Sequence, residues 1–281
     1  MKRSILLLTI MGVWVGLASA QSPWLSDTRL TSISLEWDKP LFDDRTLDRD
    51  VVTSATSVLF LTGRVRVNDS FRVVGELPIS HFGYENNNPL GDDNSTIIGN
   101  IYAGGIWDVN MRNPNTHLFV ELGVRIPTAP ESTTKRFGGM TGMLSENERA
   151  EAFATDSWAI PLVGNYVTSV SGPFAMKFRL GTIYDIYIDD LESFDNEFHL
   201  LYGLTGLYRK PNVEAHLGFS GRNPYAGNNP DFFDVGFTQI RAGIARPFRN
   251  ITPGVYVRKP LGENYNRLVD FAYGFSIEIR G

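Results

Sequence analysis

Apolar and polar residues alternate with a period of two through most of this chain, and this pattern restricts the fold to extended strands. In residues 116–127, THLFVELGVRIP, five aliphatic residues fall on one face: Leu118, Val120, Leu122, Val124 and Ile126. The other face carries His117, Glu121 and Arg125, because successive strand side chains point to opposite sides. One strand alone does not say which face meets water.

The same alternation predicts twelve strands and leaves almost no helical pattern. The strands are expected at 29–38, 57–67, 71–80, 97–110, 116–126, 158–170, 174–188, 197–209, 213–223, 233–246, 251–259 and 267–280. The chain is therefore predicted to be all-β.

The connections between these strands alternate in length. Short turns rich in Gly, Pro, Asn, Asp or Ser are expected at 68–70, 112–115, 171–173, 210–212 and 246–250. Most of the others are longer and more polar, including 41–50, 84–96 and 127–157. All the short turns therefore belong to one end of the predicted sheet.

An even strand count with sorted turns is typical of outer-membrane barrels, which have short periplasmic turns and longer external loops. A soluble β-sandwich is the alternative, with its apolar face inward, but it usually has seven to nine strands. We therefore predict a transmembrane antiparallel up-and-down β-barrel of about 12 strands. Its apolar face should meet lipid, and its polar face should line the lumen.

The first twenty residues have the parts of a secretory signal peptide. Lys2 and Arg3 precede an apolar run, which ends in the A-x-A site Ala18-Ser19-Ala20. We expect residues 1–20 to be removed and 21–281 to form the barrel; a membrane anchor is the alternative. This predicts export to the outer membrane of a Gram-negative-type bacterium, with outer-membrane lipids and the barrel assembly machinery as partners. The chain ends Ile279-Arg280-Gly281 rather than on an aromatic residue, which leaves the assembly signal open.

The chain has 26 Lys and Arg residues against 31 Asp and Glu residues, a formal net charge of -5. Nucleic acid would require a basic face, so it is not expected as a partner.

Strand parity and depth assign a set of polar residues to the lumen. They are Arg64, Arg66, His117, Glu121, Arg125, Lys177, Arg179, Asp185, Glu197, His199, Glu214, His216, Glu278 and Arg280. One interpretation is a salt-bridged, solvated interior; the other is a selectivity zone that favours anionic or polar solutes. Parity also turns several apolar residues inward, which indicates a narrow or partly filled lumen: Ile98, Tyr102, Ile106, Phe119, Leu201 and Leu207.

The 127–157 connection is the longest, and loops of this length are usually functional or disordered. It could be an ordinary exposed loop, or it could fold over the mouth or into the lumen as a gate. Ser145 and Glu148 have the spacing of a capping box before a short helix. Acidic loop residues could gather a divalent cation at the rim, although no ligand spacing supports a metal site: Asp43, Asp44, Asp48, Asp50, Asp92 and Asp93.

A lipid-modifying enzyme is the nearest catalytic alternative, and it would need a serine beside a histidine. None of the four histidines has Ser at the second position after it, and His216 and Ser220 lie about 13 Å apart at strand rise. We therefore expect no catalytic residues and no cofactor.

Two motifs resemble a known family. Gly91-Asp92 leads into the strand IIGNIYAGG, and the strand HLFVELGVRI ends in Pro127-Thr128-Ala129. Together they are similar to the outer-membrane transporter family associated with the meta-pathway of phenol degradation, itself distantly similar to fatty-acid-transporter barrels. Ile126 and Ala129 stand where that family has Leu and Gly. The resemblance covers roughly 57–130 and implies passage of small molecules, often hydrophobic or aromatic, across the outer membrane.

The sequence thus predicts an outer-membrane channel or transporter for small-molecule solutes. A lipid-modifying enzyme and a structural or adhesive barrel that acts through its external loops remain the alternatives.

Overall fold

The structure, a computed structural model, describes residues 30–43, 55–84, 93–130, 136–188, 196–224, 236–261 and 268–281. The expected signal peptide and the acidic residues Asp44, Asp48, Asp50 and Asp92 lie outside these ranges. Strands make up the wall: β1 (Ser32–Phe42), β2 (Ser57–Arg66), β3 (Phe71–Tyr84), β4 (Asp93–Ile98), β5 (Ile101–Val109), β6 (Thr116–Ile126), β7 (Ser157–Ser171), β8 (Phe174–Tyr187), β9 (Glu197–Lys210), β10 (Val213–Pro224), β11 (Phe237–Ala245), β12 (Ile251–Pro260) and β13 (Val269–Arg280).

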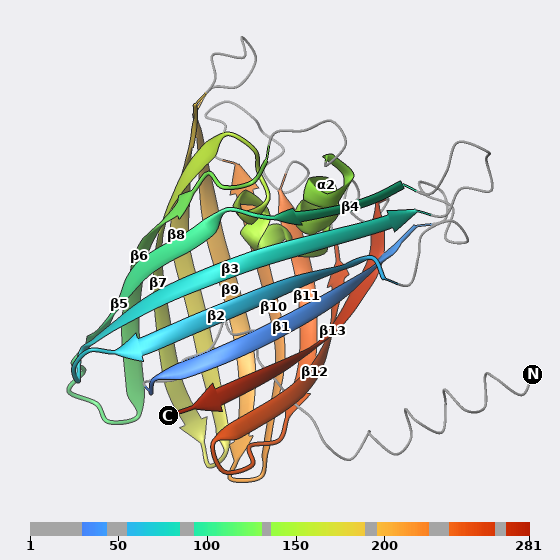
Figure 1. Cartoon of the computed structure of the whole chain (residues 1–281). Coiled ribbons are helices and arrows are strands. Elements are labelled where there is room, and N and C mark those ends of the chain that lie inside the picture. Colours follow the sequence, from blue (N-terminus) through green and yellow to red (C-terminus); the bar gives the residue numbers. More distant parts are fainter. Residues whose placement is uncertain are drawn as a thin grey trace, which may run out of the picture.

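The strands form one closed antiparallel barrel (Figure 1). Sequence neighbours pair around the wall, β1 pairs with β13, and the β2–β3 pairing completes the ring. Because β4 and β5 both pair with β3, one after the other, the thirteen segments occupy twelve positions. The predicted 12-strand barrel is therefore confirmed.

The expected strand at 97–110 is interrupted at Gly99 and Asn100, where β4 ends and β5 begins. The interruption changes which residues face inward. Ile97 is buried on β4, whereas Tyr102 is buried on β5. Ile98 is 51% exposed, so its predicted inward position is wrong.

On the other strands, the inward and outward faces are those that the alternation of apolar and polar residues in the sequence predicts. On β6, Phe119, Glu121 and Arg125 are buried inside the barrel, while Leu122 and Ile126 are 43% and 38% exposed. Exposed large apolar side chains recur in the same way on the outer side of other strands, as Leu180 does on β8. A barrel with an apolar outside and a polar inside has the arrangement of a membrane barrel rather than of a soluble one.

The short connections lie together at one end of the barrel, the short-turn end. They join β2 to β3, β5 to β6, β7 to β8, β9 to β10 and β11 to β12. The β7–β8 turn places Gly172 at φ +52°, a left-handed conformation that glycine adopts without a steric penalty. The opposite end, the long-loop end, carries the connection between β6 and β7 (Figure 1).

That connection contains the helix α2 (Arg136–Ser145) and the 3₁₀ helix η3 (Asn147–Ala152). Within the described residues, no helix is long and apolar enough to cross a membrane.

Candidate functional site

Residues 136–153, which include α2 and η3, lie within the barrel and are called the plug here (Figure 1). Its apolar anchor is Phe153, which is buried against Phe60 of β2 with ring centroids 5.8 Å apart in an edge-to-face arrangement. Val58, Ile97 and Ala152 complete this cluster. Residues 136–153 of the 127–157 connection therefore fold into the lumen, the second of the two arrangements considered from the sequence.

Arg149 connects the plug to two strands of the wall. Its guanidinium lies 2.7 Å from Glu36 of β1 and 2.9 Å from Glu76 of β3. It also lies 3.5 Å from the centroid of the Phe60 ring, a cation–π contact. All three charged side chains are fully buried, so each depends on the others for compensation of its charge.

Glu146 connects the plug to two further strands of the wall, β11 and β12. Arg258 of β12 donates to it at 2.8 Å, and Arg241 of β11 lies 3.9 Å away. Arg241 in turn lies 2.8 Å from Glu36. The ion pairs therefore run from β11 and β12 through the plug and back to β1.

Glu148 and Glu151 make two further connections. Ser220 of β10 and Gln239 of β11 donate hydrogen bonds to Glu148, the latter at 2.9 Å. Glu151 pairs with Arg125 of β6 at 3.0 Å and with Arg222 of β10. Strands from opposite sides of the ring thus converge on residues 146–151, so the plug spans the barrel.

The strand interruption at Gly99 and Asn100 binds the chain both before and after the plug. The Asn100 side chain accepts hydrogen bonds at 2.9 Å from the backbone amides of Thr128 and Ala129. It donates to the carbonyls of Glu151 and Ala154, at 2.9 and 2.6 Å.

Gly99 permits a close approach at the same place. A Cβ there would lie 2.1 Å from the carbonyl oxygen of Ala152, a distance that no side chain tolerates. The two motifs that carry the family resemblance, IIGNIYAGG and Pro127-Thr128-Ala129, therefore meet where the plug is fastened.

The expected capping box does not form. Ser145 is the last residue of α2, and its hydroxyl donates to the Thr141 carbonyl within that helix. Glu148 turns instead to the barrel wall. A short helix does follow, as η3, but Glu146 rather than Ser145 is its N-cap residue, and Glu146 makes no side-chain cap.

The plug carboxylates have opposite electrostatic environments. Burial raises the pKa of Glu148, but Arg179 and the hydrogen bonds from Ser220 and Gln239 outweigh it and hold this pKa below its usual value. At Glu146, burial outweighs the nearby arginines and raises the pKa. Acidification should therefore protonate Glu146 before Glu148.

The lumen near the short-turn end is packed differently. Val74, Tyr102, Ile106, Phe119, Val167 and Leu207 form one buried cluster on the inner wall. Arg72 and Lys177 lie over the Phe119 ring at 5.7 and 5.4 Å from its centroid. Arg72 also pairs with Asp108 at 2.9 Å, and Asp108 contacts His117.

The structure places most of the expected lumen residues inside the barrel. The buried ones are Arg64, Glu121, Arg125, Lys177, Arg179, Asp185, His199 and His216. His117, Glu197, Glu214, Glu278 and Arg280 are partly exposed, and the last two pair with each other at 2.8 Å. Arg66 lies at the short-turn rim, where its side chain is 42% exposed and pairs with Asp69.

Sequence reasoning missed most of the residues that hold the plug. They are Glu36, Asn100, Glu146, Glu148, Arg149, Glu151, Arg241 and Arg258. The alternation on the first strand does place Glu36 and Asp38 on its polar face, which is a usable signal. The plug itself has no strand parity from which an orientation could be read.

No protein-family model matches the chain, and no curated protein matches it in sequence. Among solved structures, an outer membrane channel from Pseudomonas putida F1 is similar with a TM-score of 0.62 and 14% identity, over 92% of this chain and 98% of that one. The NanC porin is similar with a TM-score of 0.54 and 6% identity, over 89% of this chain and all 100% of that one. At such identities the likeness concerns the fold, and the chain has the fold of the outer-membrane β-barrels.

Proposed function

We propose that this protein is an outer-membrane channel for small solutes whose lumen is closed by the plug. The observation that carries the proposal is the ion-pair connection between plug and wall, centred on Arg149. A segment needed only to fill the barrel could be held by apolar contacts, whereas ion pairs can exchange with water and with charged solutes. The likeness to a channel and a porin supports the same proposal.

The lumen favours solutes that combine a charge with an apolar body. Solutes entering from the long-loop end first meet the paired carboxylates and guanidiniums around the plug. Beyond the plug lies the wall cluster around Phe119, flanked by Arg72 and Lys177. The family resemblance, which implies hydrophobic or aromatic molecules, agrees with such a path, and we propose small aromatic solutes that carry a charge.

The exposed apolar side chains on the outer face support insertion in the outer membrane of a Gram-negative-type bacterium. Outer-membrane lipids would surround this face, and the barrel assembly machinery would insert the chain. An enzymatic function has less support, because the Ser220 hydroxyl donates to Glu148 rather than to His216.

Single-channel recording in planar bilayers tests the proposal. The wild-type barrel should conduct weakly or intermittently, and a variant with residues 136–153 replaced by a Gly-Ser segment of equal length should conduct several-fold more. Arg66→Met is the matched control, because Arg66 ends β2 at the short-turn end and its exposed ion pair with Asp69 lies outside the plug. If neither the wild type nor the plug-replaced variant conducts any ion or solute, the channel proposal is overturned.

A further inference from the structure

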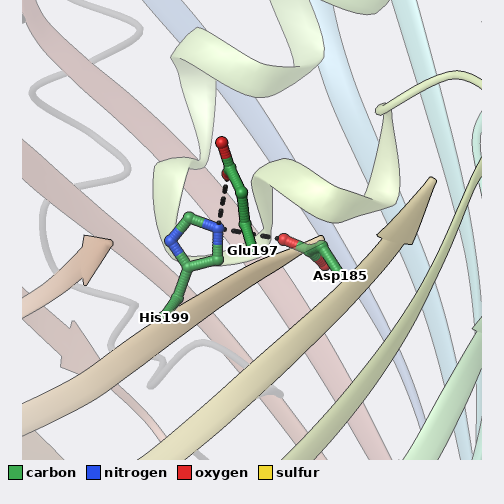
Figure 2. Close-up of side chains that lie close together, drawn as sticks. All are labelled: Asp185, Glu197 and His199. Carbon is green, nitrogen blue, oxygen red and sulfur yellow. Dashed lines mark ion pairs between the residues drawn. The ribbon is translucent and has the colours of Figure 1, made fainter. Parts of the chain in front are cut away.

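Asp185, Glu197 and His199 form a cluster near the long-loop end that takes no part in holding the plug directly (Figure 2). Asp185 of β8 and Glu197 of β9 are cross-strand partners, and His199 lies two residues after Glu197 on the same face. The strand register alone therefore brings the imidazole and the two carboxylates together.

The histidine points at both carboxylates. His199 Nε2 lies 3.1 Å from Asp185 Oδ2 and 3.1 Å from Glu197 Oε2. One N–H cannot be aligned with two oxygens at once, and among the described residues neither ring nitrogen of His199 has a hydrogen-bond partner. The imidazole is nevertheless only 10% exposed. A buried ring nitrogen at ion-pair distance from two carboxylates, with no aligned hydrogen bond to either, has the arrangement of a ligand set that could share a cation.

The separations fit a metal ion. Two ligand atoms about 2.0 Å from a tetrahedral Zn²⁺ lie about 3.3 Å apart, close to the two distances measured from Nε2. One donor atom from each of the three residues lies within 4.8 Å of the others. An imidazole combined with carboxylates suits a first-row transition cation better than Ca²⁺ or Mg²⁺, which take oxygen ligands.

The charge around the cluster also favours a divalent cation. Arg222 lies 2.6 Å from Asp185 Oδ2, but it pairs with Glu151 as well, so its positive charge is shared between two carboxylates. Asp185 and Glu197 therefore place two acidic groups beside the imidazole with only a shared guanidinium to compensate them. The remaining oxygen of Asp185, Oδ1, is buried and has no hydrogen-bond partner within the part of the chain that the structure describes, and Arg222 fixes the orientation of the carboxylate.

We propose that Asp185, Glu197 and His199 form a binding site for a divalent transition cation of the Zn²⁺ class at the outer part of the lumen. The Glu197 side chain is 44% exposed, which gives the ion access and leaves a coordination position for water. Arg222 connects the site to the plug through Glu151. This inference goes beyond the proposed channel, because ion binding requires only the folded barrel.

Titration calorimetry with ZnCl₂ on tag-free barrel in detergent micelles tests the site. We expect stoichiometric binding to the wild type, with affinity lowered more than about tenfold by His199→Gln and by Glu197→Gln. The second variant changes a half-exposed residue, so it keeps the test valid if the first fails to fold. Heat-dependent migration on gels verifies folding of each variant.

His216→Gln is the matched control, because His216 Nε2 is also buried and makes no hydrogen bond to any described residue, but lies outside the cluster. It should bind Zn²⁺ like the wild type. Absence of Zn²⁺ binding, binding unchanged in both cluster variants, or equal preference for Ca²⁺ would each overturn the proposal. Because the assay measures no conductance, its outcome is independent of whether the barrel proves to be a channel.

Discussion

The two halves of the lumen are held together in different ways. Toward the long-loop end, the plug meets the wall through buried ion pairs, with Arg149, Glu146 and Glu151 each contacting at least two partners. Toward the short-turn end, wall packs on wall around Phe119. Apolar packing requires every neighbour to stay in place, whereas an ion pair can be replaced by water and counter-ions. The difference indicates that the short-turn half is the fixed frame and the plug half is the part able to rearrange.

Removing the central guanidinium should have the largest effect on the plug half. Arg149→Met keeps the length and apolar stem but leaves Glu36 and Glu76 buried without this partner. Loss of one partner of a buried pair costs about 3–5 kcal/mol. We expect the plug to undock while the barrel persists, measured as faster hydrogen exchange in 136–153 with unchanged heat-dependent gel migration. Unchanged exchange in the plug would contradict the assigned role of Arg149.

A cavity in the short-turn half should destabilise the whole barrel without releasing the plug selectively. Phe119→Ala removes a buried ring at the centre of the wall cluster, which costs about 3 kcal/mol at the lower end of the range for such changes. We expect a lower urea midpoint for the whole barrel and no selective release of the plug. If exchange increased in 136–153 alone, the two halves would not be separate as described.

A smaller loss of stability is expected from a change at Asn100, in the strand interruption that holds the ends of the plug segment. Asn100→Ala removes four hydrogen bonds of the strand interruption but no charge pair. Buried backbone groups left without partners cost about 1–3 kcal/mol. Exchange should increase at the ends of the connection, near 128–129 and 151–154, more than at Arg149. Asn165→Ala, at another buried asparagine, serves as the control; an equal effect in both variants would refute a special role for Asn100.

The barrel could be predicted from sequence because its cause is local and repeated. Alternation on each strand gives the face of residues such as Leu122 and Glu121, and closure follows from the need to pair every edge. At Ile98, directly before Gly99 and Asn100, this rule fails, because parity counted through the interruption assigns Ile98 to the wrong face.

The plug could not be predicted because its contacts are long-range. Arg149 meets Glu36 across 113 residues of sequence, and no period within 136–153 indicates an inward face. Its charges resemble those of a solvated loop until the barrel encloses them. Asp185, Glu197 and His199 were each assigned to the lumen by parity, but only strand register brings them into one cluster.

The single asparagine at the strand interruption has a consequence for the entropy of the enclosed segment. Asn100 binds the backbone both before the plug, at Thr128 and Ala129, and after it, at Glu151 and Ala154. The two ends of the intervening chain are therefore held together by Asn100. The entropic cost of closing this loop is already met by these hydrogen bonds, so it does not oppose formation of the ion pairs. When the ion pairs break, the hydrogen bonds of Asn100 still hold both ends of the plug segment beside the wall. Its return to the docked position is then a local rearrangement rather than a refolding of the chain.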